Sequence, residues 1–167
     1  KNIEARLKKN DYFQIVWIPH AWDKAFIVER NVTKDKAESG WDEEQTHPPL
    51  FERAFENVAL ELTKNRDWRP GLMNAAMALQ PDRTRHVGRS DVILSRPLPP
   101  QQRETEFSFP LEDAERVAYA LGEAIEKNHL KMNFPCSMRF AKNDDALMSL
   151  NNRKNPSGIS CYISVLL

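Results

Sequence analysis

The chain has 167 residues, the length of one domain that can bury a core of its own. Its 24 Lys and Arg residues balance its 24 Asp and Glu residues, so the zero net charge argues against nucleic acid as a partner. No apolar run approaches the roughly 20 residues of a transmembrane segment, so none is predicted.

The two cysteines, Cys136 and Cys161, lack CxxC spacing and cannot form a disulfide framework, so we expect two buried, reduced thiols. No signal peptide is recognised in the sequence, and we expect a soluble protein that is cytoplasmic or peripheral to a membrane rather than secreted. The chain begins with Lys1 and stops within a predicted strand, so we expect a fragment of a longer protein.

The first half of the chain predicts a β-hairpin followed by two helices. Residues 12–18 are rich in aromatic and β-branched side chains, and residues 25–32 form a second strand after a short link. Residues 34–49 are polar and predict a loop. Helical spacing predicts one helix over residues 50–65 and another with Pro70 in its first turn. The apolar stripe of the second helix, which we interpret as core, consists of Leu72, Met73, Ala76 and Met77.

The second half predicts strands arranged around one long helix. Residues 91–95 predict a short strand, and alternating patterns predict three more, over residues 103–109, 134–140 and 159–165. An amphipathic pattern predicts a helix over residues 111–130, and Asn-Pro-Ser-Gly at 155–158 predicts the turn before the last strand. The order strand–helix–strand–strand predicts an α+β fold, with a mostly antiparallel sheet and helices packed on one face.

The last three predicted strands each have one apolar and one polar face. If the apolar faces pack beneath the helices, the opposite side of the sheet gathers Glu106, Ser108, Ser137, Arg139, Ser160, Tyr162 and Ser164. A solvated sheet face is the simpler interpretation of this pattern. The alternative is that this face roofs a ligand site supplied by another domain. The adjacent acids Asp144 and Asp145 are interpreted as a turn rather than a carboxylate pair.

Other catalytic patterns are weak. The four histidines, His20, His47, His86 and His129, have no metal-ligand spacing with one another or with a cysteine, so no metal is expected. The five glycines form no Gly-rich phosphate-binding loop of the GxGxxG or P-loop type, and the sequence has no GxSxG nucleophile motif.

A resemblance to a known family begins at residues 134–140, Phe-Pro-Cys-Ser-Met-Arg-Phe, followed by Asp-Asp-Ala-Leu-Met-Ser at 144–149. This stretch resembles a segment of the aldonolactone oxidases, vanillyl-alcohol-oxidase-type flavoproteins that include the D-arabinono-1,4-lactone, L-gulonolactone and alditol oxidases. The family segment has a proline, a variable residue, a glutamate, an apolar residue and an arginine, then two aspartates and a serine. Other segments match in the same order, so the likeness covers about residues 10–32 and 88–167.

The resemblance implies that residues 1–167 are the substrate-cap domain of a larger flavoprotein, with a ferredoxin-like sheet and a variable helical insert at residues 33–87. FAD would be bound mainly by an N-terminal domain that is absent from this sequence, so the fragment alone is expected to be inactive. The implied reaction is oxidation of a CH–OH group of a sugar-1,4-lactone or polyol by hydride transfer to FAD.

Arg139 matches the family arginine, and the resemblance implies that it is catalytic and contacts the flavin, where its charge stabilises the reduced form. Glu106, Ser137 and Tyr162 are implied to bind the substrate. Ser137 departs from the family pattern, because it stands where the family has a glutamate. The chain also stops before the family's C-terminal His-Trp-x-Lys motif. The serine favours an alternative function, a non-catalytic binding or interaction module with the same fold.

Overall fold

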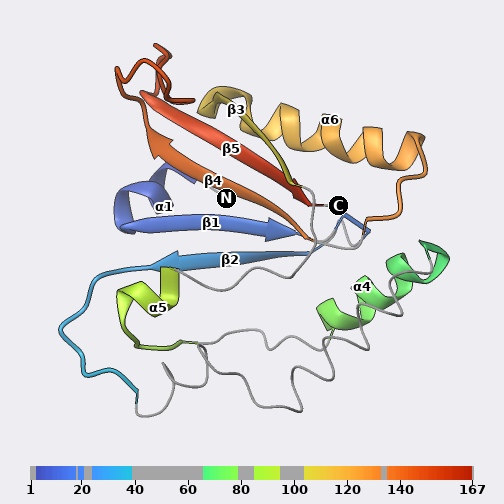
Figure 1. The fold of residues 1–167 in the computed structure, drawn as a ribbon, viewed down its shortest axis with the longest axis horizontal. Coiled ribbons are helices and arrows are strands. Elements are labelled where there is room, and N and C mark those ends of the chain that lie inside the picture. Colours follow the sequence, from blue (N-terminus) through green and yellow to red (C-terminus); the bar gives the residue numbers. More distant parts are fainter. Residues whose placement is uncertain are drawn as a thin grey trace.

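A five-stranded antiparallel sheet forms the centre of the computed structural model, in the strand order β2-β1-β4-β5-β3 (Figure 1). The structure describes residues 3–17, 19–20, 24–38, 66–78, 85–94, 104–132 and 135–166. The predicted helix at residues 50–65 lies outside the described residues.

The predicted N-terminal hairpin is confirmed. Strand β1 (Tyr12–Trp17) pairs antiparallel with β2 (Ala25–Arg30) along its whole length, from Tyr12 opposite Arg30 to Trp17 opposite Ala25. Side chains close the open end of the hairpin. The Asn31 side-chain oxygen accepts a 3.0 Å hydrogen bond from the Asp11 N–H, and the Asp11 carboxylate accepts a 2.9 Å bond from the Val32 N–H. These bonds fix the start of β1 beside the end of β2.

A split β-α-β unit forms the rest of the sheet. Strand β3 (Glu104–Pro110) leads through a 3₁₀ turn at Leu111–Asp113 into helix α6 (Ala114–Lys127), which is followed by β4 (Cys136–Lys142) and β5 (Ile159–Leu166). Because β5 lies antiparallel between β3 and β4, those two strands run parallel to each other. This is the arrangement of a ferredoxin-like half, and it confirms the predicted α+β class with an antiparallel sheet.

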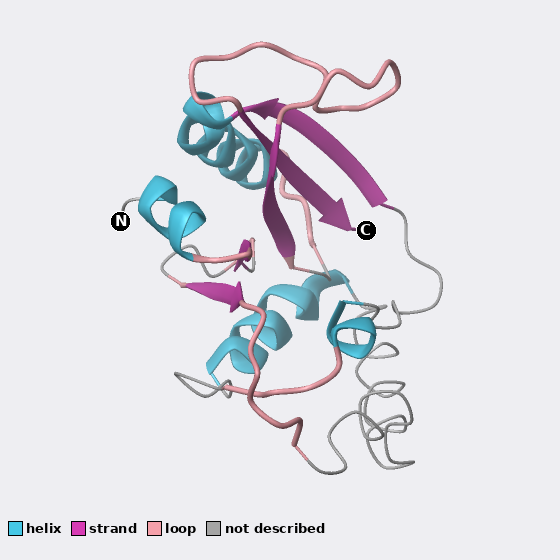
Figure 2. Ribbon diagram, turned by 90° about the vertical axis from the view of Figure 1, so that its left-hand side faces the viewer, coloured by secondary structure: helices cyan, strands magenta, loops and turns pink. Residues whose placement is uncertain are grey.

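Helices α6 and α1 (Ile3–Lys9) cover one face of the sheet (Figure 2). The core between them contains Trp17, Met138 and Ile163 from the strands, with Leu7 of α1 and Leu121 of α6 packed against it. Burial of such side chains is the main source of stability, at roughly 25 cal/mol per Å² of apolar surface. No described helix is long and apolar enough to cross a membrane.

Both cysteines lie in this core as free, buried thiols, which confirms the expectation from the sequence. Cys136 on β4 and Cys161 on β5 have no exposed surface. Burial raises the pKa of each thiol to about 12, because the apolar surroundings disfavour the thiolate.

Phe107 is less buried than the alternating pattern of β3 predicts. It stands opposite the buried Ile163 and so lies on the helix-covered face, yet it is 58% exposed. The reason is that β3 is the edge strand of the sheet formed by the described residues, where β5 is its one neighbour. The alternation of polar and apolar residues predicts which face of the sheet a side chain lies on. How much of that side chain is buried depends on the position of its strand in the sheet.

The strand predicted at residues 91–95 is wrong. Residues Ser90–Leu94 form a short helix, α5. The N–H groups of Val92 and Ile93 donate to the Arg89 carbonyl oxygen at 3.2 and 3.0 Å, and the Arg89 guanidinium bonds the Asp91 carboxylate at 2.6 Å. An apolar run this short does not separate strand from helix, and the local turn bonds decide it.

The predicted helix that contains Pro70 is confirmed as α4 (Arg69–Ala78), which follows a 3₁₀ turn at Arg66–Trp68. Figure 1 shows α4 and α5 beyond β2, outside the helix-covered face of the sheet. The Arg69 guanidinium donates a 2.7 Å bond to the Lys131 carbonyl oxygen, which ties α4 to the segment between α6 and β4.

The predicted turn before β5 is also confirmed. The Gly158 N–H donates to the Asn155 carbonyl oxygen at 3.1 Å, and Gly158 has a left-handed φ of 64°. The Glu112 carboxylate braces this turn by accepting bonds from the Asn155 side chain at 2.8 Å and the Ser157 N–H at 2.6 Å. These bonds, the Asn155 one foremost, lower the pKa of Glu112 to about 2.

Candidate functional site

The polar face of the sheet is the side that α1 and α6 leave uncovered. On β4, Cys136 and Met138 belong to the core, so Ser137 and Arg139 emerge on the opposite side. The register places Tyr162 of β5 opposite Arg139. Glu106 of β3 stands opposite Ser164 of β5, which in turn stands opposite Ser137. The four predicted site residues, Glu106, Ser137, Arg139 and Tyr162, therefore share one face.

Arg139 and Glu106 form an ion pair that crosses strand β5. A terminal nitrogen of the Arg139 guanidinium bonds the Glu106 carboxylate, and the two side chains are 52% and 28% exposed. Glu106 is therefore engaged by a cation of its own sheet. An oriented guanidinium on an open sheet face can bind a carboxylate, a phosphate or a developing negative charge.

Ser164 of β5 contacts the acidic member of this ion pair. Its side chain is nearly fully buried, and its hydroxyl lies 3.3 Å from Glu106 Oε1 while it also bonds the Glu104 carboxylate. A hydroxyl has one proton to donate, so one of the two carboxylates receives it at a time. The alternation of β5 places Ser164 on the polar face, but only the register reveals that it lies between two acids.

Tyr162 is held by the loop that connects β4 to β5. Its hydroxyl donates to the side-chain oxygen of Asn151. Burial raises the pKa of the Tyr162 hydroxyl, and the nearby carboxylates of Glu106 and Asp144 add to the rise. The hydroxyl is thus a neutral donor that is already used within the chain.

The same loop closes one end of the polar face. Asp144 forms a turn, as predicted, because its carboxylate accepts bonds from the Ala146 N–H at 3.1 Å and the Ser149 hydroxyl at 2.7 Å. Arg153 anchors the loop on β3 by donating to the carbonyl and hydroxyl oxygens of Ser108, each at 3.0 Å. The sequence gives no signal for Arg153, since loop residues follow no periodic pattern.

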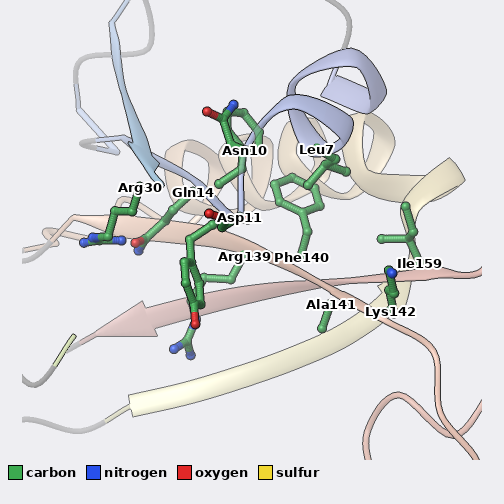
Figure 3. A pocket seen from close by; sticks show the side chains of 12 residues that line it. Leu7, Asn10, Asp11, Gln14, Arg30, Arg139, Phe140, Ala141, Lys142 and Ile159 are labelled. Atoms are coloured by element: carbon green, nitrogen blue, oxygen red, sulfur yellow. The ribbon is translucent and has the colours of Figure 1, made fainter. Parts of the chain in front are cut away.

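A hollow of about 570 Å³ lies on the other side of Arg139, where the start of β1 separates from the end of β4 (Figure 3). Gln14 of β1 and Arg30 of β2 line it together with Arg139. Gln14 stands directly opposite Arg139 in the β1–β4 ladder. Neither residue was predicted from the sequence as a site residue. A polar Gln14 within the otherwise apolar segment at residues 12–17 is the pattern that could have indicated it.

His20 has a structural role. Its Nε2 lies 3.0 Å from the Met132 nitrogen, whose N–H it accepts when the imidazole is neutral, and 3.3 Å from the Met132 carbonyl oxygen. Burial lowers the pKa of His20 below its ordinary value of 6.5. Among the residues that the structure describes, no group of three or more His, Cys, Asp and Glu side chains could hold a metal ion.

Comparison with known proteins decides the family. The model of the family described as D-arabinono-1,4-lactone oxidase matches residues 1–167, the entire sequence. The chain belongs to the D-arabinono-1,4-lactone oxidase family. It is 22% identical to L-gulonolactone oxidase from Scyliorhinus torazame over 169 residues and 22% identical to that from Bos taurus over 174 residues. Each alignment covers 99% of this chain and 37% of the relative, so the chain spans less than half the length of these oxidases.

Ser137 is the serine of the Phe-Pro-Cys-Ser-Met-Arg-Phe segment at residues 134–140 of this D-arabinono-1,4-lactone oxidase family member. Its side chain is half-buried, and it stands between Val16 of β1 and Ser164 of β5 in the ladder. The carboxylates nearest in register are therefore Glu104 and Glu106 of β3, which lie on the far side of β5.

Proposed function

We propose that this chain is the substrate-capping part of an FAD-dependent oxidoreductase that oxidises the CH–OH group of a sugar-1,4-lactone or polyol. The observation that carries the proposal is the Arg139 guanidinium, exposed on the uncovered sheet face and oriented by Glu106, in a chain of this family. In this proposal, an N-terminal domain of the intact protein binds most of the FAD molecule.

In this proposal the polar face contacts the ring of FAD rather than its phosphates. A guanidinium has five N–H donors, and the contact with Glu106 engages one of the Arg139 nitrogens. The five glycines of the sequence form no phosphate-binding loop. When bound, FAD would supply the hydride acceptor for the oxidation.

Arg139 would hold a positive charge where negative charge develops during the reaction. Glu106 orients the guanidinium before the reaction starts, so little reorganisation is needed at that moment. The hydroxyl of Ser137 would orient a substrate hydroxyl, because a hydroxyl both donates and accepts hydrogen bonds. Tyr162 would contribute its ring, since its own hydroxyl is bonded to Asn151.

The decisive experiment measures flavin reduction in the intact protein by stopped-flow absorbance with a sugar lactone or polyol substrate. Arg139→Ala should slow the reduction about 100-fold, the scale of losing one donor to a developing charge. Arg139→Lys, which keeps the charge without the planar fork, should recover part of the rate.

Arg116→Ala is the matched control, because Arg116 forms an exposed ion pair with Asp113 on the helix-covered side. A reduction rate in Arg139→Ala equal to that of the wild type would remove Arg139 from the mechanism and with it the proposed function.

A further inference from the structure

The loop between β4 and β5 presents two apolar side chains at a tight turn. The Ser149 N–H donates a 3.0 Å hydrogen bond to the Ala146 carbonyl oxygen, so the two residues between them are the centre of a β-turn. These residues are Leu147, which is 96% exposed, and Met148, which is 98% exposed. Turn centres favour Gly, Pro, Asn, Asp and Ser, which suit the backbone there. Neither the turn nor packing within this chain therefore gives a reason for apolar residues at these two positions.

Hydrogen bonds fix the shape of the loop that carries this turn. Its ends are joined where the Asp144 N–H donates to the Asn151 carbonyl oxygen at 3.2 Å. Within the loop, the Asp144 carboxylate accepts bonds from the Ala146 N–H and the Ser149 hydroxyl. The Asn152 side chain also donates a 3.1 Å bond to the Ala146 carbonyl oxygen. Compact surface loops with joined ends frequently have a function, and this one holds two apolar side chains out toward solvent.

The loop is attached to the polar face of the sheet. The Ser108 hydroxyl on β3 donates to the Leu150 carbonyl oxygen at 3.0 Å. The Tyr162 hydroxyl on β5 bonds the side chain of Asn151. Figure 1 and Figure 2 show the loop standing beyond the ends of β4 and β5. The turn is therefore fixed at the margin of the face that, in the proposed function, is directed toward FAD.

The length of the relatives indicates what covers the turn. The alignments cover 37% of each of the two L-gulonolactone oxidases, so most of such a protein lies outside the part that this chain matches. Contact with that remainder would remove both apolar side chains from water, which is the main drive for packing between parts of a protein. Residues 146–149 carry no charge, so an apolar partner surface would bury no unpaired ion.

We propose that Leu147 and Met148 form a docking element that packs into an apolar surface of the remainder of the intact protein. That the remainder binds FAD rests on the proposed function. The docked turn holds the polar face, through the bonds to Ser108 and Tyr162, at a fixed position relative to that remainder.

Methionine oxidation tests the burial without any substitution. The intact protein is treated with dilute hydrogen peroxide, and sulfoxide formation at Met148 is followed by peptide mass spectrometry. Because solvent access governs the reaction, Met148 should be oxidised about tenfold or more slowly in the folded protein than in protein unfolded by urea. Met138, which is 4% exposed in the core, is the reference for a buried methionine. Oxidation of Met148 at the unfolded rate would overturn the proposal.

A double variant tests what the contact contributes. Leu147→Ser combined with Met148→Ser should lower the thermal unfolding midpoint of the intact protein by about 3 °C or more, because two buried apolar side chains are lost. Leu147→Met combined with Met148→Leu keeps the apolar volume and should leave the midpoint within about 1 °C of the wild type. Tyr119→Gln is the control, because this α6 side chain is also exposed, at 70%. An unchanged midpoint in the double serine variant would contradict the docking.

Two other occupants give their own results, and either result would overturn the proposal. Protection of Met148 that is lost on dilution from micromolar to nanomolar protein would assign the turn to a contact between two copies of the chain. Protection that requires phosphatidylcholine vesicles would assign the turn to a lipid surface.

The outcome is separable from that of the proposed function. Protection of Met148 in a protein whose flavin reduction is unaffected by Arg139→Ala would retain the docking element and reject the proposed function. Flavin reduction that depends on Arg139, with Met148 oxidised at the unfolded rate, would do the reverse.

Discussion

Arg139 and Glu106 hold each other across strand β5, although 32 residues separate them in the chain and their own strands do not touch. The two positions that the bridge crosses are Tyr162, opposite Arg139, and Ser164, opposite Glu106. The carboxylate thereby holds one terminal nitrogen of the guanidinium, whose side chain is half exposed. We propose that Glu106 positions the Arg139 guanidinium.

Glu106→Gln tests this role. The amide still accepts a hydrogen bond but has no charge, so in the intact protein flavin reduction should slow about tenfold, the effect of ~1.4 kcal/mol of lost positioning. The free energy of unfolding should change by less than about 1 kcal/mol, since the pair is partly solvated. Asp113→Asn, which breaks the exposed pair with Arg116, is the control and should alter neither quantity appreciably. Wild-type reduction in Glu106→Gln would contradict the role.

Two glycine substitutions should change stability in opposite directions. Gly158→Ala should lower the free energy of unfolding by roughly 1–2 kcal/mol, because a side chain disfavours its φ of 64°. Gly71→Ala should raise that free energy by up to about 1 kcal/mol, because Gly71 lies in helix α4. A Cβ at either position meets no atom within 4 Å, so backbone conformation alone sets the sign. Urea unfolding measures the free energy of unfolding of both variants. A Gly158→Ala variant that is as stable as the wild type would contradict the assigned turn.

His20 predicts a loss of stability in mild acid. Its pKa is lowered in the folded state, so its contribution is complete above the ordinary value of 6.5 and decreases as the pH falls through the folded pKa. His20→Gln keeps an acceptor for the Met132 N–H and does not titrate, so its urea midpoint should fall less than that of the wild type between pH 7 and pH 5. His129→Asn is the control, since asparagine tolerates the left-handed φ of 51° there and the acid slope should remain. Identical slopes in wild type and His20→Gln would refute the prediction.

The two core thiols should be unreactive until the protein unfolds. With no exposed surface and a pKa of about 12, neither Cys136 nor Cys161 presents a thiolate to solvent at pH 8. Ellman's reagent should therefore modify neither Cys136 nor Cys161 in the native protein within minutes, and both of them in 6 M urea. Rapid modification of the native protein would show that the layer formed by β4, β5 and α6 is not closed.

Most of the sheet could be predicted from the sequence because strand alternation has a period of two and so assigns each side chain to a face. That logic placed Ser137, Arg139 and Tyr162 together and put Cys136 and Met138 in the core. Strand order and register are set by contacts between distant segments, and alternation carries no information about them. The position of Gln14 opposite Arg139 and the bridge from Arg139 to Glu106 therefore required the structure.

Local patterns failed where a segment was short or lay at an edge. The apolar run at residues 91–95 fits a strand as well as a helix, and the turn bonds to the Arg89 carbonyl oxygen decide the outcome. Phe107 lies on the predicted face of β3 but is 58% exposed, because none of the described strands lies beyond β3.

The place of β5 between β4 and β3 determines when Arg139 and Glu106 can meet during synthesis. Strands β3 and β4 leave the ribosome first, but they have no ladder with each other until β5 inserts between them. A nascent chain that stops after Lys142 carries both Arg139 and Glu106 and cannot bring them together. The polar face is complete only when its last strand has been made, so the Arg139 guanidinium is oriented after helix α6 has left the ribosome.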